Sequence, residues 1–248
     1  MVGSPPVASP PVGSPPVGLR RRLLAEFIGC VVLAAAVVGS GIAAQTLSPH
    51  DVGLQLTENA FATALALFVL IAVLAPVSGA HLNPIISMVD AILGRRPWRE
   101  VPGYAAAQVA GCAAGVILAN LMFGHPPVAI STTHRLSPAH ALAEVIATAG
   151  LVMVVFVLAR FGRERLAPAA VAAYIGAAYL FTSSTSFANP AITLGRTLSN
   201  TFAGIDPISA AGFIVAQLVG GVAGCALVAA LAPRQTRAPA LDQEGAQP

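Results

Sequence analysis

The chain has 248 residues, of which 56% are hydrophobic and only 9% are charged. Soluble globular domains carry roughly a quarter charged residues, so the composition excludes a protein that covers itself with polar surface in water. The formal net charge is +3, and all 13 basic residues are arginines in short clusters between apolar runs. This pattern favours membrane orientation over nucleic-acid binding.

Tails rich in proline or polar residues flank the apolar part of the chain. Residues 1–19 contain a five-residue repeat, VGSPP, VASPP, VGSPP, which cannot bury enough apolar surface to fold. We therefore predict a disordered tail over residues 1–19, a membrane domain over 20–233 and a second disordered tail over 234–248. The three cysteines lie inside apolar runs with no paired spacing, so we predict no metal site and no cofactor.

Eight apolar segments are spaced along the membrane domain. A spanning helix needs roughly 20 mostly apolar residues, and six segments meet or approach that length: 23–47, 59–77, 101–123, 139–159, 166–181 and 208–232. Two more, 84–93 and 190–198, are too short to span, and each begins with proline, which is favoured in a first helical turn. Short helices at membrane depth need protein or a water-filled cavity around them. The sequence therefore predicts an all-α membrane protein with six transmembrane helices and two re-entrant half-helices.

The arginines predict the orientation of these helices. With the N-terminus inside, eleven arginines fall on the cytoplasmic side and only Arg135 and Arg196 fall outside. Arginine is enriched in cytoplasmic loops. We therefore expect a multi-pass protein of the cell membrane, embedded in the lipid bilayer, with both termini cytoplasmic.

The two halves of the domain, about 22–124 and 138–232, carry the same motifs in the same order. The paired motifs are Ala-Glu at Glu26 and Glu144, Asn-Pro at Asn83 and Asn189, and Ala-Gln-x-x-Gly at Gln108 and Gln217. Because each half has three spans, the second copy must enter the bilayer upside down. Inverted repeats with broken helices place the functional site at the midplane, between the two copies.

The paired Asn-Pro motifs suggest what that site does. They read Asn83-Pro84-Ile85 and Asn189-Pro190-Ala191. Each half-helix N-terminus exposes unpaired N–H groups and roughly half a positive charge, so two of them at the midplane raise the energy of a cation or proton there. A neutral hydroxylated solute can instead accept hydrogen bonds from the two Asn side chains. A single Asn-Pro would be read as a capped helix start, but two in an inverted repeat favour a pore.

The sequence around both motifs resembles the two signatures of the major intrinsic proteins, the aquaporin and aquaglyceroporin superfamily. The stretches are SGAHLNPI at residues 78–85 and TSFANPA at 185–191, and the resemblance covers residues 23–232. It implies the aquaporin-like fold, small neutral solutes as partners, no nucleic acid, and a homotetramer with one pore per protomer. The first signature usually ends in alanine, so Ile85 leaves open how closely the half-helices approach.

Two acids within the apolar spans need partners, because a carboxylate at a helix centre costs roughly 2.5–3.5 kcal/mol. By the resemblance, Glu26 and Glu144 each accept N–H bonds from the neighbouring re-entrant loop, and direct contact with solute is the alternative. Gln108 and Gln217 are expected to do similar work between helices. His81, in the loop that carries the first signature, is expected to pack that loop, and a role as a ligand is the alternative.

The resemblance also implies a narrow ring of four residues on the outer side of the midplane. Spacing from the signatures gives the selectivity filter Thr63, Ala177, Ser186 and Ile192, with Tyr179 as the alternative to Ala177. Water-selective members place an aromatic residue, a histidine and an arginine there. The ring here is small and has no arginine, so we expect it to suit uncharged polyols or metalloid hydroxides such as neutral arsenite.

Two further features bear on the solute. The stretch at residues 181–193 is similar to the aquaporin-like channels of bacterial arsenic-resistance operons. Arg196 lies one helical turn after Ile192 on the same face. It either replaces the missing filter arginine from higher in the vestibule or pairs with Asp206 or a carbonyl group.

Three classes of function fit the sequence. A passive channel for water, polyols and other small neutral solutes is favoured. A secondary active transporter would need an ion-coupling site, for which Glu26 and Glu144 are the intramembrane candidates in matching places. A closed, structural member of the family is the third class. We predict no enzyme, because no nucleophile–base pair, paired carboxylates or metal-ligand spacing is found.

Overall fold

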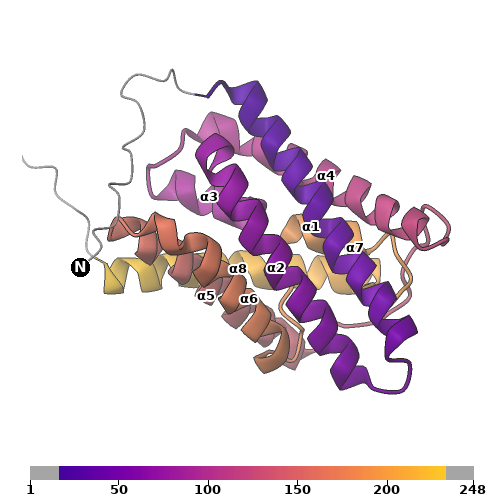
Figure 1. Cartoon of the computed structure of the whole chain (residues 1–248). Coiled ribbons are helices and arrows are strands. Elements are labelled where there is room, and N and C mark those ends of the chain that lie inside the picture. Colours follow the sequence, from indigo (N-terminus) through magenta and orange to yellow (C-terminus); the bar gives the residue numbers. More distant parts are fainter. Residues whose placement is uncertain (1–16, 233–248) are drawn as a thin grey trace, which may run out of the picture.

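A computed structural model of the protein describes residues 17–232. The tail predicted at 234–248, and residues 1–16 of the tail predicted at 1–19, lie outside the described residues. The described helices are α1 Leu19–Leu47, α2 Val52–Ser78, α3 Pro84–Ile92, η1 Trp98–Glu100, α4 Val101–Met122, α5 Pro138–Arg160, η2 Glu164–Leu166, α6 Ala167–Phe181, α7 Pro190–Arg196 and α8 Pro207–Leu231. Figure 1 shows them as one bundle, with the short α3 and α7 among the long helices.

The predicted pattern of six spans and two half-helices is confirmed. Five of the described helices (α1, α2, α4 with η1, α5 and α8) are long and apolar enough to cross a membrane. The sixth, α6, has only 15 residues and packs between α2 and α5. The 3-10 turn η2 leads directly into it, which lengthens the helical segment toward the loop.

The second helix begins seven residues before the predicted start at residue 59. Its first two turns carry polar side chains, which a count of apolar residues leaves out. Asp51 caps this start, because its side chain accepts the N–H of Leu54 at 2.9 Å. Gln55 and Glu58 then bond Ser48 in the preceding turn, at 2.8 and 2.7 Å. These polar contacts explain why the helix extends beyond its apolar part.

The inverted repeat appears as two equivalent helix pairs, α1 with α4 and α5 with α8. Glycines of the repeated Ala-Gln-x-x-Gly motif let these pairs come close. A Cβ atom at Gly111 would lie 2.4 Å from the carbonyl oxygen of Phe27, and one at Gly220 would lie 2.7 Å from that of Val145. Small residues at such contacts are typical of helices packed within membranes.

The two half-helices lie where the two repeats meet. α3 contacts α4 and α8, α7 contacts α4, α8 and α1, and the two half-helices also contact each other. In Figure 1, α3 lies toward the end of the bundle where α1 begins, and α7 lies toward the opposite end. The chain therefore brings two helix N-termini together in the middle of the bundle.

Candidate functional site

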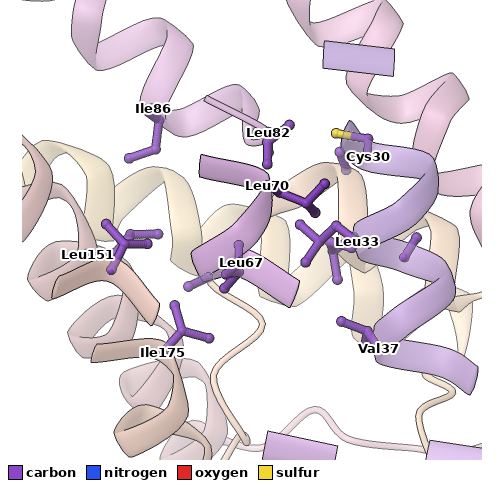
Figure 2. Close-up of a cluster of buried hydrophobic side chains, with 14 of the residues drawn as sticks. Cys30, Leu33, Val37, Leu67, Leu70, Leu82, Ile86, Leu151 and Ile175 are labelled. Carbon is purple, nitrogen blue, oxygen red and sulfur yellow. The ribbon is translucent and has the colours of Figure 1, made fainter. Parts of the chain in front are cut away.

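A cavity of about 560 Å³ lies between the two halves, and its lining extends from the α3 end of the bundle to the α7 end. Its walls are mostly apolar. Figure 2 shows Leu67, Ile86, Leu151 and Ile175 approaching one another from α2, α3, α5 and α6, and all four line the cavity. Apolar walls with a few polar groups are typical of sites for small molecules.

The two Asn residues hold the half-helices together at the middle of this cavity. Nδ2 of Asn83 donates to the carbonyl oxygen of Ala188 at 2.8 Å, and Nδ2 of Asn189 donates to that of Leu82 at 2.7 Å. Each side-chain oxygen also accepts an N–H of its own half-helix. An amide NH2 group has two hydrogens, so each Asn keeps one donor that these cross-links do not use. Both residues line the cavity.

The large residue of the first signature does not push the half-helices apart. Ile85 is 2% exposed and packs toward α8, where a Cβ atom at Gly221 would lie 2.9 Å from its Cγ2. The glycine makes room for the isoleucine, so the crossed Asn bonds still form. Pro84 and Pro190 begin α3 and α7, and Ala191 is fully buried beside them.

The two buried acids support the two re-entrant loops in the same way. Glu26 accepts from Oγ of Ser78 at 2.6 Å, from the N–H groups of His81 and Leu82 at 3.0 and 2.7 Å, and from Nε2 of Gln108 at 2.8 Å. It has no exposed surface and does not line the cavity. Its contacts are therefore with the loop and not with the lumen.

Glu144 repeats this arrangement in the second half. It accepts from Oγ of Ser184 at 2.6 Å, from the N–H groups of Phe187 and Ala188 at 2.8 and 2.9 Å, and from Nε2 of Gln217 at 2.7 Å. Hydrogen bonds to an ionised acceptor are roughly twice as strong as neutral ones. Each carboxylate can thus fix a loop that has no regular structure of its own.

These loops need such support because their backbone is strained. Within residues 17–232, five residues other than glycine have positive φ angles, and all lie in the two loops: Ala80, Leu82, Thr185, Ser186 and Ala188. A non-glycine residue in this region costs of order 1–3 kcal/mol. The carboxylates bond N–H groups within the same turns, which links the buried acids to the shape of the cavity wall.

His81 packs the first loop and also borders the cavity. Its Nδ1 lies 3.0 Å from Oγ of Ser87, and its Nε2 lies 3.5 Å from a carboxylate oxygen of Asp90. Asp90 in turn pairs with Arg95 and Arg96, each at 3.2 Å. This charged group at the α3 end of the cavity was not predicted, although Asp90, an acid in an apolar half-helix, was the signal for it.

Three of the four predicted filter positions line the cavity and one does not. Thr63, Ser186 and Ile192 line the cavity near its α7 end. Ala177 does not: it is exposed on the outside of α6, and Tyr179 lines the cavity instead. Residues two apart on a helix point about 200° apart, so a slip of two positions exchanged the faces. The hydroxyl of Tyr179 lies 3.4 Å from Oγ1 of Thr63.

Arg196 lies at the same end of the cavity, at the last residue of α7. Of the two pairing partners proposed from the sequence, the carbonyl is right and Asp206 is wrong. Nε of Arg196 donates to the carbonyl oxygen of Ala203, whereas Asp206 caps α8 through N–H groups of its first turn. The guanidinium carbon lies 3.5 Å from the ring centroid of Phe187.

Comparison with known proteins identifies relatives over nearly the whole chain. The sequence profile of the family described as Major intrinsic protein matches residues 16–188 and 170–246. Aquaglyceroporin AqpS of Rhizobium meliloti (strain 1021) is 49% identical over 210 residues, which cover 85% of this chain and 89% of that protein. Aquaporin NIP1-3 of Oryza sativa subsp. japonica is 37% identical over 182 residues, covering 71% and 62% of the two chains. In three dimensions, the aquaglyceroporin from Plasmodium falciparum matches with a TM-score of 0.65 at 22% identity, covering 84% of this chain and 95% of that one.

Proposed function

The chain belongs to the major intrinsic protein family, and we propose that it is a passive channel through which small uncharged solutes cross the cell membrane. The supporting observation is the cavity between the repeats, with Asn83 and Asn189 cross-linking two helix N-termini in its wall. A solute at that level meets N–H donors and two positive helix ends. Cations and protons are disfavoured there, and neutral solutes with oxygen acceptors are accommodated.

Within that class, we propose glycerol-like polyols and neutral metalloid hydroxides such as arsenous acid as preferred solutes, with water also passing. The cavity wall as a whole is mostly apolar, and Ile192 lines it at the position where the resemblance to the family implies an arginine. The carbon face of a polyol can pass such a wall while its hydroxyls meet the sparse polar groups. The similarity to a protein named aquaglyceroporin agrees with this choice.

The exposed surface of the protein bears on where the channel lies and how it assembles. Large apolar side chains are exposed along the outside of α2, among them Phe61, Leu65, Phe68 and Val73, which are 45–66% exposed. Such a surface is suited to lipid or to neighbouring copies of the chain. We propose a homotetramer in the cell membrane, with both termini in the cytoplasm.

An active transporter is less well supported than a channel. Glu26 and Glu144 each accept four hydrogen bonds from the loops and helices around them, and neither lines the cavity. Asp90 does line it but pairs with two arginines. An acid that binds and releases a coupling ion would have to exchange these partners in each cycle.

The test is solute flux in proteoliposomes that contain the folded protein. Light scattering would follow shrinkage and reswelling after gradients of glycerol, urea and arsenous acid, with protein-free liposomes as control. We expect reswelling faster than in the control for glycerol and arsenous acid, and no accumulation against a gradient. Folded protein without any flux would support the closed, structural class, and uphill accumulation driven by a proton gradient would support a transporter.

A further inference from the structure

The outer face of α1 is apolar along its first half and basic at its first turn. Leu24, Ile28 and Val32 are 45–57% exposed, and their spacing of four residues places them on one face of the helix. Arg20 and Arg21 lie four and three residues before Leu24, so both stand at the end of the same face. Both arginines are exposed. These five side chains form a ridge, called the α1 ridge below, that is apolar except for two cations at its end.

The two arginines have no acidic partner in the part of the chain that the structure describes. The acids at this end of the bundle pair with other arginines, as Glu100 does with Arg22 at 2.8 Å. Residues 1–19, which precede the ridge, contain no charged side chain. The charge of Arg20 and Arg21 is therefore left for an anionic group from outside the described chain.

The short helix η1 lies beside the first turn of α1. Both guanidinium NH2 groups of Arg22 donate to the carboxylate of Glu100 at 2.8 Å, which fixes the two segments next to each other. Within η1, Trp98 is 56% exposed and Arg99 is exposed. Tryptophan is enriched at the level of the lipid headgroups, where its ring meets both acyl chains and water. This places the headgroup layer at the first turn of α1.

We propose that the α1 ridge binds an anionic phospholipid of the leaflet at this end of the bundle. The lipid phosphate accepts charge-assisted hydrogen bonds from Arg20 and Arg21, and an acyl chain lies along the apolar side chains of the ridge. An amphiphile satisfies both parts at once, whereas a free anion leaves the apolar part uncovered and an apolar helix face leaves the cations unpaired. Arg99 adds a third cation at the same level. A lipid with net negative charge is preferred over a zwitterionic one, whose ammonium group the arginines repel.

Trp98 is the single tryptophan of the chain and reports on this site directly. The folded protein would be reconstituted in mixtures of phosphatidylglycerol and phosphatidylcholine, the latter with brominated acyl chains that quench tryptophan fluorescence. Relief of quenching measures how strongly the anionic lipid displaces the zwitterionic one. We expect a preference for phosphatidylglycerol of roughly tenfold or more, since each arginine at the membrane surface contributes about fivefold. The preference should fall at high ionic strength, and no preference in the wild type would overturn the proposal.

Two matched double variants locate the effect. Arg20→Gln with Arg21→Gln should remove most of the preference. Arg163→Gln with Arg165→Gln removes the same charge from an exposed loop at the same end of the bundle. That loop borders the cavity, which Glu164 lines, so this control should keep the preference. Equal losses in both double variants would indicate a general surface potential and no site on α1, and the proposal would fall.

Further measurements separate the lipid from other occupants of the ridge. Arg20→Lys with Arg21→Lys should fold and keep most of the preference, because an ammonium group also pairs with phosphate. Loss of the preference on adding millimolar inorganic phosphate at constant ionic strength would make the site one for a free anion. If Arg20→Gln with Arg21→Gln broke up the oligomer in size-exclusion chromatography without changing the lipid preference, a second copy of the chain would cover the ridge. Either result would overturn the proposal.

Discussion

Two side chains on α6, two positions apart, differ in whether they line the cavity. Tyr179 is 3% exposed and lines the cavity beside Thr63, whereas Ala177 lies on the outer surface. We expect Tyr179→Ala to open the α7 end, so that permeability to polyols larger than glycerol rises severalfold. The measurement is a series of polyols of increasing length in matched proteoliposomes.

The matched control is Ala177→Val, which adds volume on the outside of the same helix. It should leave the size limit unchanged. If Ala177→Val shifted the limit and Tyr179→Ala did not, the constriction would lie on the other face of α6, and the spacing taken from the sequence would be right after all.

The distance of each position from Asn189 along the chain explains why only part of the site could be predicted from the sequence. Ser186 and Ile192 lie three residues before and after Asn189, and over so short a distance the count places both at the cavity. Ala177 is twelve residues away, across the end of α6 and an irregular loop whose backbone no count of residues fixes. Arg196 could be identified from the sequence as a residue near the site. Its stacking on Phe187 could not, because it depends on a strained loop that helical periodicity does not reveal.

At the scale of elements, the helices could be predicted from the length of the apolar runs. The contacts between the helices depend instead on small residues. Gly115 on α4 faces α1, where an added Cβ atom would lie 2.2 Å from the carbonyl oxygen of Val31. We expect Gly115→Ala to force α1 and α4 apart and to destabilise the protein by about 1–3 kcal/mol, the usual cost of overpacking. Thermal unfolding of the detergent-solubilised protein would measure this as a lower midpoint.

Gly103 on the same helix is the control. A Cβ atom there would come no closer than 3.4 Å to its nearest neighbour, a methyl group of Leu23, which is ordinary contact. Gly103→Ala should therefore unfold at or above the wild-type midpoint, since alanine is also the better helix former. Equal midpoints for the two variants would mean that the α1–α4 contact tolerates more space than its geometry indicates.

At the scale of the whole molecule, the arginines gather at one end of the bundle. Nine of the described arginines lie at the end where α1 begins, and only Arg135 and Arg196 lie at the other. Ion pairs join segments at the first end: Arg22 with Glu100 at 2.8 Å and Arg95 with Glu164 at 3.6 Å. Figure 1 also shows that α1 begins and α8 ends on this side. The imbalance supports a cytoplasmic location for that end.

This orientation can be tested with single introduced cysteines. His50 lies in the exposed turn between α1 and α2, and Arg163 lies in the exposed loop between α5 and α6, at the arginine-rich end. We expect a membrane-impermeant thiol reagent to label His50→Cys in right-side-out vesicles and Arg163→Cys only in inside-out vesicles. Because Cys30 and Cys112 are buried and Cys225 is half-buried, the wild type measures the background. The reverse pattern would invert the orientation, and labelling of both from one side would contradict the arrangement of six spans.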